Sequence, residues 1–299
     1  MNHGIWVTPS NQSLENAVKK AGGKLTSCAD ASAIICTHDD LADLSRSLHP
    51  NIRWVQLGAA GIETWFDAGV MKPEILWTAA KGVYAKPIAE HILAMMLAAC
   101  RELPTRLRAK SWGESGGRMF AGSTVGVIGA GGIGMELFSL LKPFDVHTLS
   151  INRRGSFVGA DISLAPENLN ELLVASDFVV LAAPLTSETR GMISTEQFRQ
   201  MRSSSWLINI ARGQIVNTED LLQALINKDI AGASLDVTEP EPLPIGHPFW
   251  EMENVIVTPH VSGTFSMGLP FLASRVEENV RRFIAHKPLL GLVDLEASY

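Results

Sequence analysis

Short apolar runs alternate with amphipathic stretches along most of the chain. Helical patterns at residues 14–21 and 41–48 separate the first runs, and the alternation restarts at Thr124. This order is typical of parallel α/β architecture, in which strands covered on both faces are apolar throughout. The strands that the pattern predicts are Ile5–Val7, Ala33–Cys36, Trp54–Leu57, Leu76–Thr78, Thr124–Ile128, Val146–Ile151, Phe178–Leu181, Trp206–Ile210, Ala233–Val237 and Val255–Thr258.

The two series of strands predict two α/β domains with a cleft between them. A helix expected over Pro87–Leu103 joins the series, and the polar stretch Ser111–Gly117 follows it. Another long helical pattern at residues 269–286 is expected to return the chain to the first domain. The expected division is therefore residues 1–93 for the first part of one domain, 94–268 for the second domain, and 269–299 for the rest of the first.

Composition and charge narrow the class of protein. The 299 residues suffice for two domains, and 46% hydrophobic with 19% charged residues is typical of a globular chain. A formal net charge of −6 gives no overall attraction to nucleic acid or to an anionic membrane, so neither partner is expected. The N-terminus shows no leader, and Cys28, Cys36 and Cys100 lack metal-ligand spacing. We therefore expect a cytoplasmic protein without a bound metal.

A glycine-rich motif follows the apolar run Thr124–Ile128 and precedes a helical pattern. The first glycine permits a tight turn, the second lets a pyrophosphate approach the backbone, and the third lets helix and strand pack closely. A glycine-rich turn without a ligand is the plainer interpretation of such a motif alone. The flanking strand and helix favour a dinucleotide held at the helix N-terminus. Its expected contacts here are Gly129, Gly131, Gly132, Ile133 and Gly134.

The segment after the next predicted strand distinguishes the two nicotinamide dinucleotides. Where an acidic side chain would hold the ribose 2′-hydroxyl, the chain has Asn152-Arg153-Arg154. A missing acid and two added cations favour a 2′-phosphate, and therefore NADP(H). NAD stays open as the weaker alternative, because surface arginines are common and Asn152 can itself bond a ribose hydroxyl.

Three polar residues follow predicted strands of the second series. Arg212 follows the run 206–210, Glu241 lies in a proline-rich loop, and His260 follows the run 255–258. Ligands of open parallel sheets bind outside the carboxyl ends of the strands. Taken singly, these residues have plainer interpretations as a surface cation, a solvated loop residue and a hydrogen-bonding histidine. Together they fit an enzyme that must orient a substrate, polarise its carbonyl and move one proton beside a nicotinamide.

The order of these motifs resembles the D-isomer-specific 2-hydroxyacid dehydrogenase family over nearly the whole chain. The segments 183–191, 209–213, 236–244 and 258–260 are similar to the later signatures of that family. Within the family, the chain resembles a glyoxylate/hydroxypyruvate reductase-like member that prefers NADP. The resemblance implies an α/β fold with a Rossmann-like doubly wound sheet in residues 94–268. It implies a discontinuous flavodoxin-like substrate domain in residues 1–93 and 269–299. It also implies a homodimer that reduces a small 2-keto acid to a D-2-hydroxy acid.

The resemblance also implies roles for individual residues. Arg212 would bind the substrate carboxylate, helped by backbone N–H groups of Ala60 and Gly61. His260 would exchange a proton with the substrate oxygen, while Glu241 orients its ring and favours its charged form. Asp236 is expected near the nicotinamide amide. Further coenzyme contacts are implied for Ala183, Pro184, Thr189, Ile210, Ala211, His260 and Gly263.

An alternative from another class is a corepressor or metabolic sensor that binds the dinucleotide without turnover. Such a protein would keep the glycine motif after losing its catalytic residues, whereas Arg212, Glu241 and His260 are all present here. Glyoxylate, hydroxypyruvate and a bulkier 2-keto acid stay open as substrates. Tyr84, Trp112 and Trp250 are candidates for a substrate pocket, with core or interface packing as their plainer interpretation.

Overall fold

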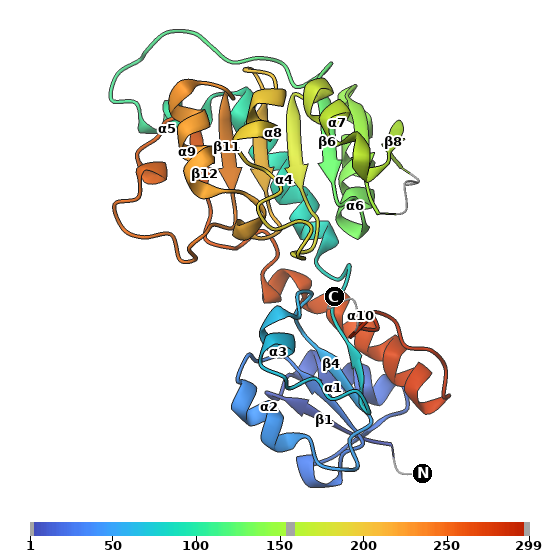
Figure 1. Ribbon diagram of the computed structural model, residues 1–299. Helices are drawn as coiled ribbons and strands as arrows, with labels where there is room; N and C mark the ends of the chain where they lie inside the picture. Colours follow the sequence, from blue (N-terminus) through green and yellow to red (C-terminus); the bar gives the residue numbers. More distant parts are fainter. Residues whose placement is uncertain (1–2, 154–158, 296–299) are drawn as a thin grey trace. The chain divides into compact units, whose positions relative to one another are not determined.

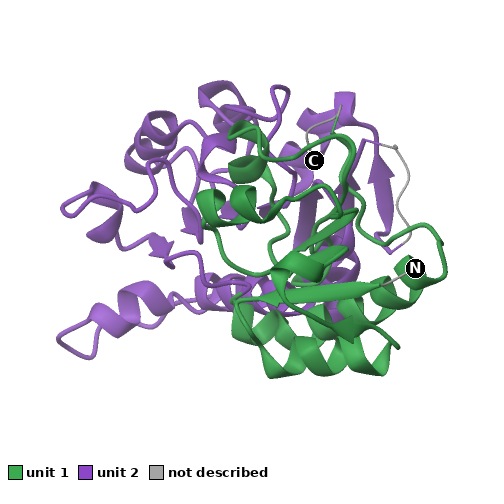
Figure 2. Cartoon of the chain, turned by 90° about the horizontal axis from the view of Figure 1, so that it is seen from below, with its two compact units in different colours: residues 1–84, 264–299 green, residues 85–263 purple. Residues whose placement is uncertain are grey.

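The computed structural model describes residues 3–153 and 159–295 (Figure 1). The chain divides into two compact units, which Figure 2 colours separately. Unit 1 consists of Met1–Tyr84 and Thr264–Tyr299, and unit 2 of Ala85–Gly263. The expected domain limits at residues 93 and 268 stay predictions of the sequence. No helix within the described ranges is long and apolar enough to cross a membrane.

Unit 1 contains a five-stranded parallel sheet in the order β2-β1-β3-β4-β5. This is the flavodoxin-like order of doubly wound α/β folds. One face of the sheet packs into a cluster of buried apolar side chains. Its strands are β1 (Gly4–Thr8), β2 (Lys24–Leu25), β3 (Ala33–Cys36), β4 (Trp54–Leu57) and β5 (Leu76–Thr78).

The long C-terminal helix α10 (Phe265–Ile284) belongs to unit 1, where it packs against α1. A buried polar network fixes it to the sheet: the Asn279 amide donates to Gln56 Oε1 at 2.9 Å, and the Thr78 hydroxyl donates to the same oxygen at 2.9 Å. The Leu290 N–H donates to Asn279 Oδ1 at 2.8 Å. The other helices of unit 1 are α1 (Gln12–Lys20), η1 (Cys28–Asp30), α2 (Leu41–Ser47) and α3 (Glu63–Asp67).

Unit 2 contains a seven-stranded parallel sheet in the order β12-β11-β10-β9-β6-β7-β8. Its first six strands in the chain have the Rossmann order, so the strand order reverses between β6 and β9, where ligands of such sheets bind. The expected α/β fold with two parallel sheets is therefore confirmed. The strands are β6 (Thr124–Ile128), β7 (His147–Ile151), β8 (Ile162–Leu164), β9 (Phe178–Leu181), β10 (Trp206–Asn209), β11 (Gly232–Leu235) and β12 (Val255–Val257).

Helices cover both faces of this sheet (Figure 1). One core cluster contains apolar side chains of α4 and α6, and the other contains side chains of α7, α8 and α9. The helices are α4 (Ala85–Cys100), α5 (Leu103–Arg108), α6 (Gly132–Leu141), η2 (Lys142–Phe144), η3 (Pro166–Asn168), α7 (Leu169–Ala175), α8 (Thr195–Gln200), η4 (Gly213–Ile215), α9 (Thr218–Asn227) and η5 (Pro248–Trp250).

Two helices differ in extent from the sequence prediction. The helix expected to end at Leu103 ends at Cys100, because Glu102 has a left-handed backbone with φ of 52° and a second helix starts after it. The return helix starts at Phe265 rather than at residue 269, because the Thr264 side chain accepts a hydrogen bond from the Met267 N–H and caps it. Both differences reflect local backbone geometry that the apolar pattern does not encode.

Candidate functional site

The glycine motif forms the turn between β6 and α6. Gly129 has a φ of 84°, and a Cβ atom there would lie 2.3 Å from the Ala183 Cα that follows β9, so only glycine fits. Gly131 caps α6, and the nearest heavy atom to a Cβ built on it is 3.9 Å away. The turn therefore leaves open space beside the N–H groups of a helix start. These features fit a bound pyrophosphate.

The remaining predicted coenzyme contacts lie around this turn or along the same edge of the sheet. Gly132, Ile133 and Gly134 form the first turn of α6. Ala183 is buried against Gly129, and the Thr189 hydroxyl donates to the Pro184 carbonyl oxygen at 2.7 Å, which closes the loop after β9. Ile210 and Ala211 are buried just beyond β10, and Gly263 ends unit 2.

The end of β7 is hydrogen-bonded to the glycine turn. The N–H groups of Gly129 and Ala130 both donate to the Ile151 carbonyl oxygen, at 2.8 and 3.1 Å. Asn152 and Arg153 directly follow, the first half-buried and the second exposed. Arg154, the other predicted contact of a 2′-phosphate, lies outside the described residues. The described part of this segment thus lies beside the predicted phosphate site.

His260 and Glu241 form a close pair beyond the carboxyl ends of β12 and β11. His260 Nδ1 lies 2.7 Å from Glu241 Oε1, and both side chains are exposed. An ionised carboxylate only accepts hydrogen bonds, so Nδ1 carries the proton in this pair. The ring's other nitrogen, Nε2, is left to exchange a proton with a ligand. The arrangement has the geometry of a general acid–base with an orienting carboxylate.

A buried carboxylate holds the backbone around His260. Asp236 accepts hydrogen bonds from the Thr258 hydroxyl at 2.6 Å and from the N–H groups of Val261 and Ser262 at 2.9 and 3.0 Å. The His260 N–H donates to the Asp236 carbonyl oxygen at 2.8 Å, and His260 has a left-handed φ of 53°. Burial raises the pKa of Asp236, but these hydrogen bonds outweigh it, and the net pKa is lowered. Asp236 therefore stays ionised and fixes the segment 258–262, which we call the histidine loop.

The residues that connect Asp236 to its surroundings are not among the site residues predicted from the sequence. His91 Nε2 on α4 lies 3.2 Å from the Thr258 hydroxyl oxygen and 3.8 Å from Asp236 Oδ1. Thr258 and Ser262 flank His260 in the motif, which was the available signal, but their partner is more than twenty residues away. The expected contact of Asp236 with a nicotinamide amide stays a prediction.

Arg212 follows β10, the neighbour of β11 in the sheet. The buried Asn209 shapes its turn, since its side chain donates to the Arg212 carbonyl oxygen at 2.9 Å and accepts from the Ala211 N–H at 3.1 Å. The half-buried guanidinium donates to the Ala211 carbonyl oxygen at 2.7 Å. Arg212, Glu241 and His260 thus lie at one edge of one sheet. Ala60 and Gly61 belong to unit 1, where they follow β4.

The aromatic candidates have different surroundings. Tyr84 is 9% exposed in unit 1, while Trp112 is 100% exposed on the segment between α5 and β6. Trp250 is 40% exposed, and its indole N–H donates to the Pro244 carbonyl oxygen at 3.0 Å. The plainer interpretation, packing within the protein, fits Tyr84.

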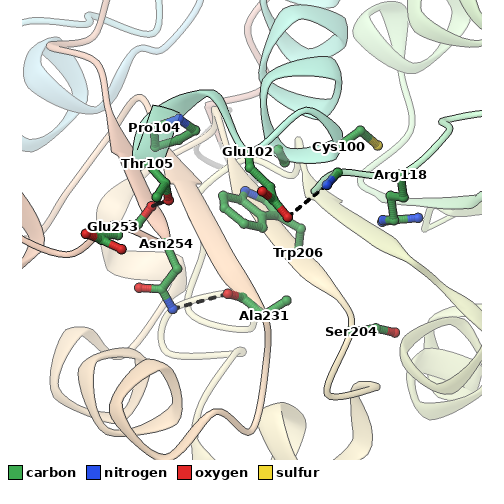
Figure 3. Close-up of a pocket in the computed structure, with 12 residues that line it drawn as sticks. Cys100, Glu102, Pro104, Thr105, Arg118, Ser204, Trp206, Ala231, Glu253 and Asn254 are labelled. Atoms are coloured by element: carbon green, nitrogen blue, oxygen red, sulfur yellow. Dashed lines mark hydrogen bonds between the residues drawn. The ribbon is translucent and has the colours of Figure 1, made fainter. Parts of the chain in front are cut away.

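A pocket of about 480 Å³ lies at the opposite edge of the sheet in unit 2 (Figure 3). Its walls include Ala231 and Asn254, which directly precede β11 and β12, and Trp206, the first residue of β10. Several of its polar groups bond to one another: the Asn254 amide donates to the Ala231 carbonyl oxygen, and the Gly117 N–H donates to Glu102. None of the predicted catalytic residues lines this pocket.

Comparison with known proteins shows the family. The model described as D-isomer specific 2-hydroxyacid dehydrogenase, NAD binding domain, matches residues 93–262. A glyoxylate reductase of Thermofilum pendens is 33% identical over 250 residues, which are 80% of this chain and 74% of that protein. The chain belongs to the D-isomer specific 2-hydroxyacid dehydrogenase family and is an oxidoreductase.

Solved structures of this family cover essentially the whole chain. A D-isomer specific 2-hydroxyacid dehydrogenase from Xanthobacter autotrophicus Py2, in complex with NADPH and MES, has a TM-score of 0.84 and 27% identity and covers 100% of both chains. An NADPH-dependent glyoxylate/hydroxypyruvate reductase from Sinorhizobium meliloti, in complex with NADP and sulfate, has a TM-score of 0.83 and 25% identity and covers 99% of both chains. The resemblance seen in the motifs is therefore confirmed at the level of fold and family.

Proposed function

We propose that this protein reduces a small 2-keto acid to a D-2-hydroxy acid, with NADPH as the electron donor. The observation that carries the proposal is the pair of His260 and Glu241, 2.7 Å apart at the sheet edge where Arg212 also lies. Relatives named as glyoxylate reductases support the substrate class.

The residues of this site divide the chemistry among them. Arg212 holds the substrate carboxylate in a bidentate pair, which fixes the position of the keto carbon. In its charged form, His260 donates the Nε2 proton to the substrate carbonyl oxygen as that oxygen gains negative charge. Glu241 accepts the Nδ1–H throughout, so it stabilises the charged ring and fixes its orientation. NADPH, when bound at the glycine turn, supplies the hydride.

The preference for NADP(H) over NAD is part of the proposal. Arg153 follows β7 beside the glycine turn, and Arg154 follows it in the sequence. Asn152 occupies the place where an acid would repel a 2′-phosphate. The two structural neighbours described above, one in complex with NADPH and one with NADP, support this choice.

We also propose that the protein is a homodimer. The segment from α5 to β6 carries three widely exposed apolar side chains, Leu107, Trp112 and Met119, at 81, 100 and 73% exposure. Apolar side chains gathered on one exposed segment are typical of an interaction surface. Light scattering of the wild type and of Trp112→Ser tests this: we expect dimer mass for the first and a larger monomer fraction for the second. Monomer mass for the wild type would reject the dimer.

A kinetic panel tests the proposed activity. NADPH and NADH oxidation is followed by absorbance with glyoxylate, hydroxypyruvate and bulkier 2-keto acids. We expect turnover with at least one acid and a higher kcat/KM with NADPH than with NADH. Tight NADPH binding without oxidation by any of the acids would instead favour the corepressor or sensor.

A further inference from the structure

Backbone hydrogen bonds fix the first two residues of the loop after β4. The Gly58 N–H donates to the Cys36 carbonyl oxygen at 2.7 Å, and the Ala59 carbonyl oxygen accepts from the Ala80 N–H at 2.8 Å. Among the residues that the structure describes, the N–H groups of Ala60 and Gly61 donate no hydrogen bond within the chain. The loop therefore presents two adjacent N–H donors, those of Ala60 and Gly61, while hydrogen bonds fix the two residues before them.

The third restraint on this loop is a side chain. The Tyr84 hydroxyl donates to the Gly58 carbonyl oxygen at 2.6 Å, in a buried environment. Burial raises the pKa of Tyr84, so the hydroxyl keeps its proton and remains a donor at neutral pH. Tyr84 directly follows the turn that starts at Ala80, in which the Val83 N–H donates to the Ala80 carbonyl oxygen at 3.0 Å. Ala80 and Tyr84 thus restrain two successive carbonyls of the loop, those of Ala59 and Gly58.

The position of the Tyr84 ring depends on a glycine in α10. A Cβ atom on Gly268 would lie 2.1 Å from Tyr84 Cε1 and 2.4 Å from Cδ1. Glycine is a poorer helix former than alanine, so a glycine in the first turn of α10 is locally unfavourable. The close approach of the Tyr84 ring explains why a glycine is present there. All of these contacts lie within unit 1.

We propose that Tyr84 is a positioning residue for substrate binding: its hydroxyl holds the Gly58 carbonyl so that Ala60 and Gly61 present their N–H groups to the carboxylate of the 2-keto acid. This inference rests on the proposed function. In this role, the Tyr84 side chain acts on the loop through the Gly58 carbonyl and not by contact with the substrate. The absence of a side chain at Gly268 leaves space for its ring. Tyr84 and Gly268 are therefore expected to influence substrate affinity more than the chemical step.

Tyr84→Phe is the direct test, because it removes one oxygen and keeps the ring. A neutral hydrogen bond contributes about 0.5–1.5 kcal/mol, which corresponds to a KM for the 2-keto acid raised roughly 2- to 12-fold. We expect kcat to stay within about twofold and the Kd of NADPH to be unchanged. Gly268→Ala, which displaces the ring from the other side, should raise KM in the same direction.

Ser32→Ala is the matched control. The Ser32 hydroxyl also donates to a carbonyl oxygen in unit 1, that of Gly4, at 3.2 Å and away from the loop. Its loss should lower stability by a similar amount and leave KM unchanged. A Tyr84→Phe protein with an unchanged KM, or with equal losses in KM, kcat and NADPH affinity, would overturn the positioning role.

Amide hydrogen exchange separates this proposal from the proposed function. In the free wild-type, Tyr84→Phe and Ser32→Ala proteins, we expect faster exchange of residues 58–61 only in Tyr84→Phe. This measurement needs no turnover. A wild-type protein that reduces no 2-keto acid would reject the proposed function, and hydrogen exchange would still test whether the Tyr84 hydroxyl fixes the loop. Unchanged exchange at residues 58–61 in Tyr84→Phe would show that Tyr84 does not fix the loop and would overturn the proposal.

Discussion

Two segments at the same edge of the unit 2 sheet are built in different ways. The histidine loop, residues 258–262, is fixed by three hydrogen bonds to the buried Asp236 carboxylate. The end of β7 is tied to the glycine turn through the Ile151 carbonyl, and Arg153 beyond it is exposed. A fixed backbone suits the proposed role of His260 in proton transfer, while the exposed Arg153 suits a choice between two coenzymes that differ by one phosphate. Substitutions in the two segments should therefore change different kinetic constants.

The largest effect is expected for His260→Ala. Loss of a positioned acid–base group typically costs about 10²- to 10⁴-fold in rate, so kcat should fall by that amount while the Kd of NADPH stays nearly constant. Steady-state rates and a fluorescence titration of NADPH measure the two quantities. His147→Ala is the control, since His147 is exposed at the start of β7 on the opposite edge. A His260→Ala enzyme with near-wild-type kcat would remove His260 from proton transfer.

A smaller loss of turnover is expected for Asp236→Asn. The amide places a donor where the Val261 and Ser262 N–H groups or the Thr258 hydroxyl need an acceptor, which displaces the histidine loop. Displacement of a catalytic group by about 1 Å can lower the rate on the order of 100-fold. Asp177→Asn is a matched control, because Asp177 accepts the Thr124 N–H at 2.8 Å at the opposite edge. Equal kcat losses in both variants would point to general destabilisation.

The β7 segment is tested by Arg153→Ala combined with Arg154→Ala. Hydrogen bonds to a charged group contribute about 1.5–3 kcal/mol, so the KM of NADPH should rise roughly tenfold or more. The KM of NADH and the kcat with either coenzyme should stay within about twofold. Arg199→Ala with Arg202→Ala removes two cations elsewhere in unit 2 and serves as the control. Equal losses for NADPH and NADH would show that the arginine pair is structural.

The smallest expected effect concerns stability in acid. The lowered native pKa of Asp236 means that its contribution is present above the ordinary value of 3.8 and is lost as pH falls through the native pKa. Wild type should therefore exceed Asp236→Asn in unfolding free energy by about 1 kcal/mol at pH 6. The difference should shrink below pH 3.8 in urea denaturation series. A difference that grows with acidification would contradict the ionised, hydrogen-bonded state of Asp236.

The sequence predicted the sheets better than their surroundings. Long apolar runs such as Trp206–Ile210 lie in β10 or within a residue of it, because buried parallel strands must be apolar. The edge strands β2 and β8 were missed, since neither contains a buried apolar run that would give a pattern. The predicted pairing of His260 with Glu241 is present, because the motifs carried it.

The contacts around the predicted site could be identified only from the three-dimensional fold. Asp236 meets Ser262, and Tyr84 meets Gly58, across separations of 26 residues each. Such pairings follow from sheet order and loop geometry, which neither periodicity nor a local motif encodes. The left-handed backbone of His260 is likewise a product of the bonds around it. Sequence reasoning predicted the reacting groups, and the structure shows the hydrogen bonds that hold the backbone around them.

The central claim is that His260 serves proton transfer while Arg153 and Arg154 select the coenzyme. It is tested most directly by the ratio of kcat/KM with NADPH to kcat/KM with NADH. This ratio is measured on one 2-keto acid for the wild type, for His260→Ala and for the Arg153→Ala, Arg154→Ala double variant. We expect His260→Ala to lower both values by the same factor and to leave the ratio unchanged. We expect the double variant to lower the ratio about tenfold through the NADPH value alone. A ratio that changes in His260→Ala, or that stays constant in the double variant, would contradict the claim.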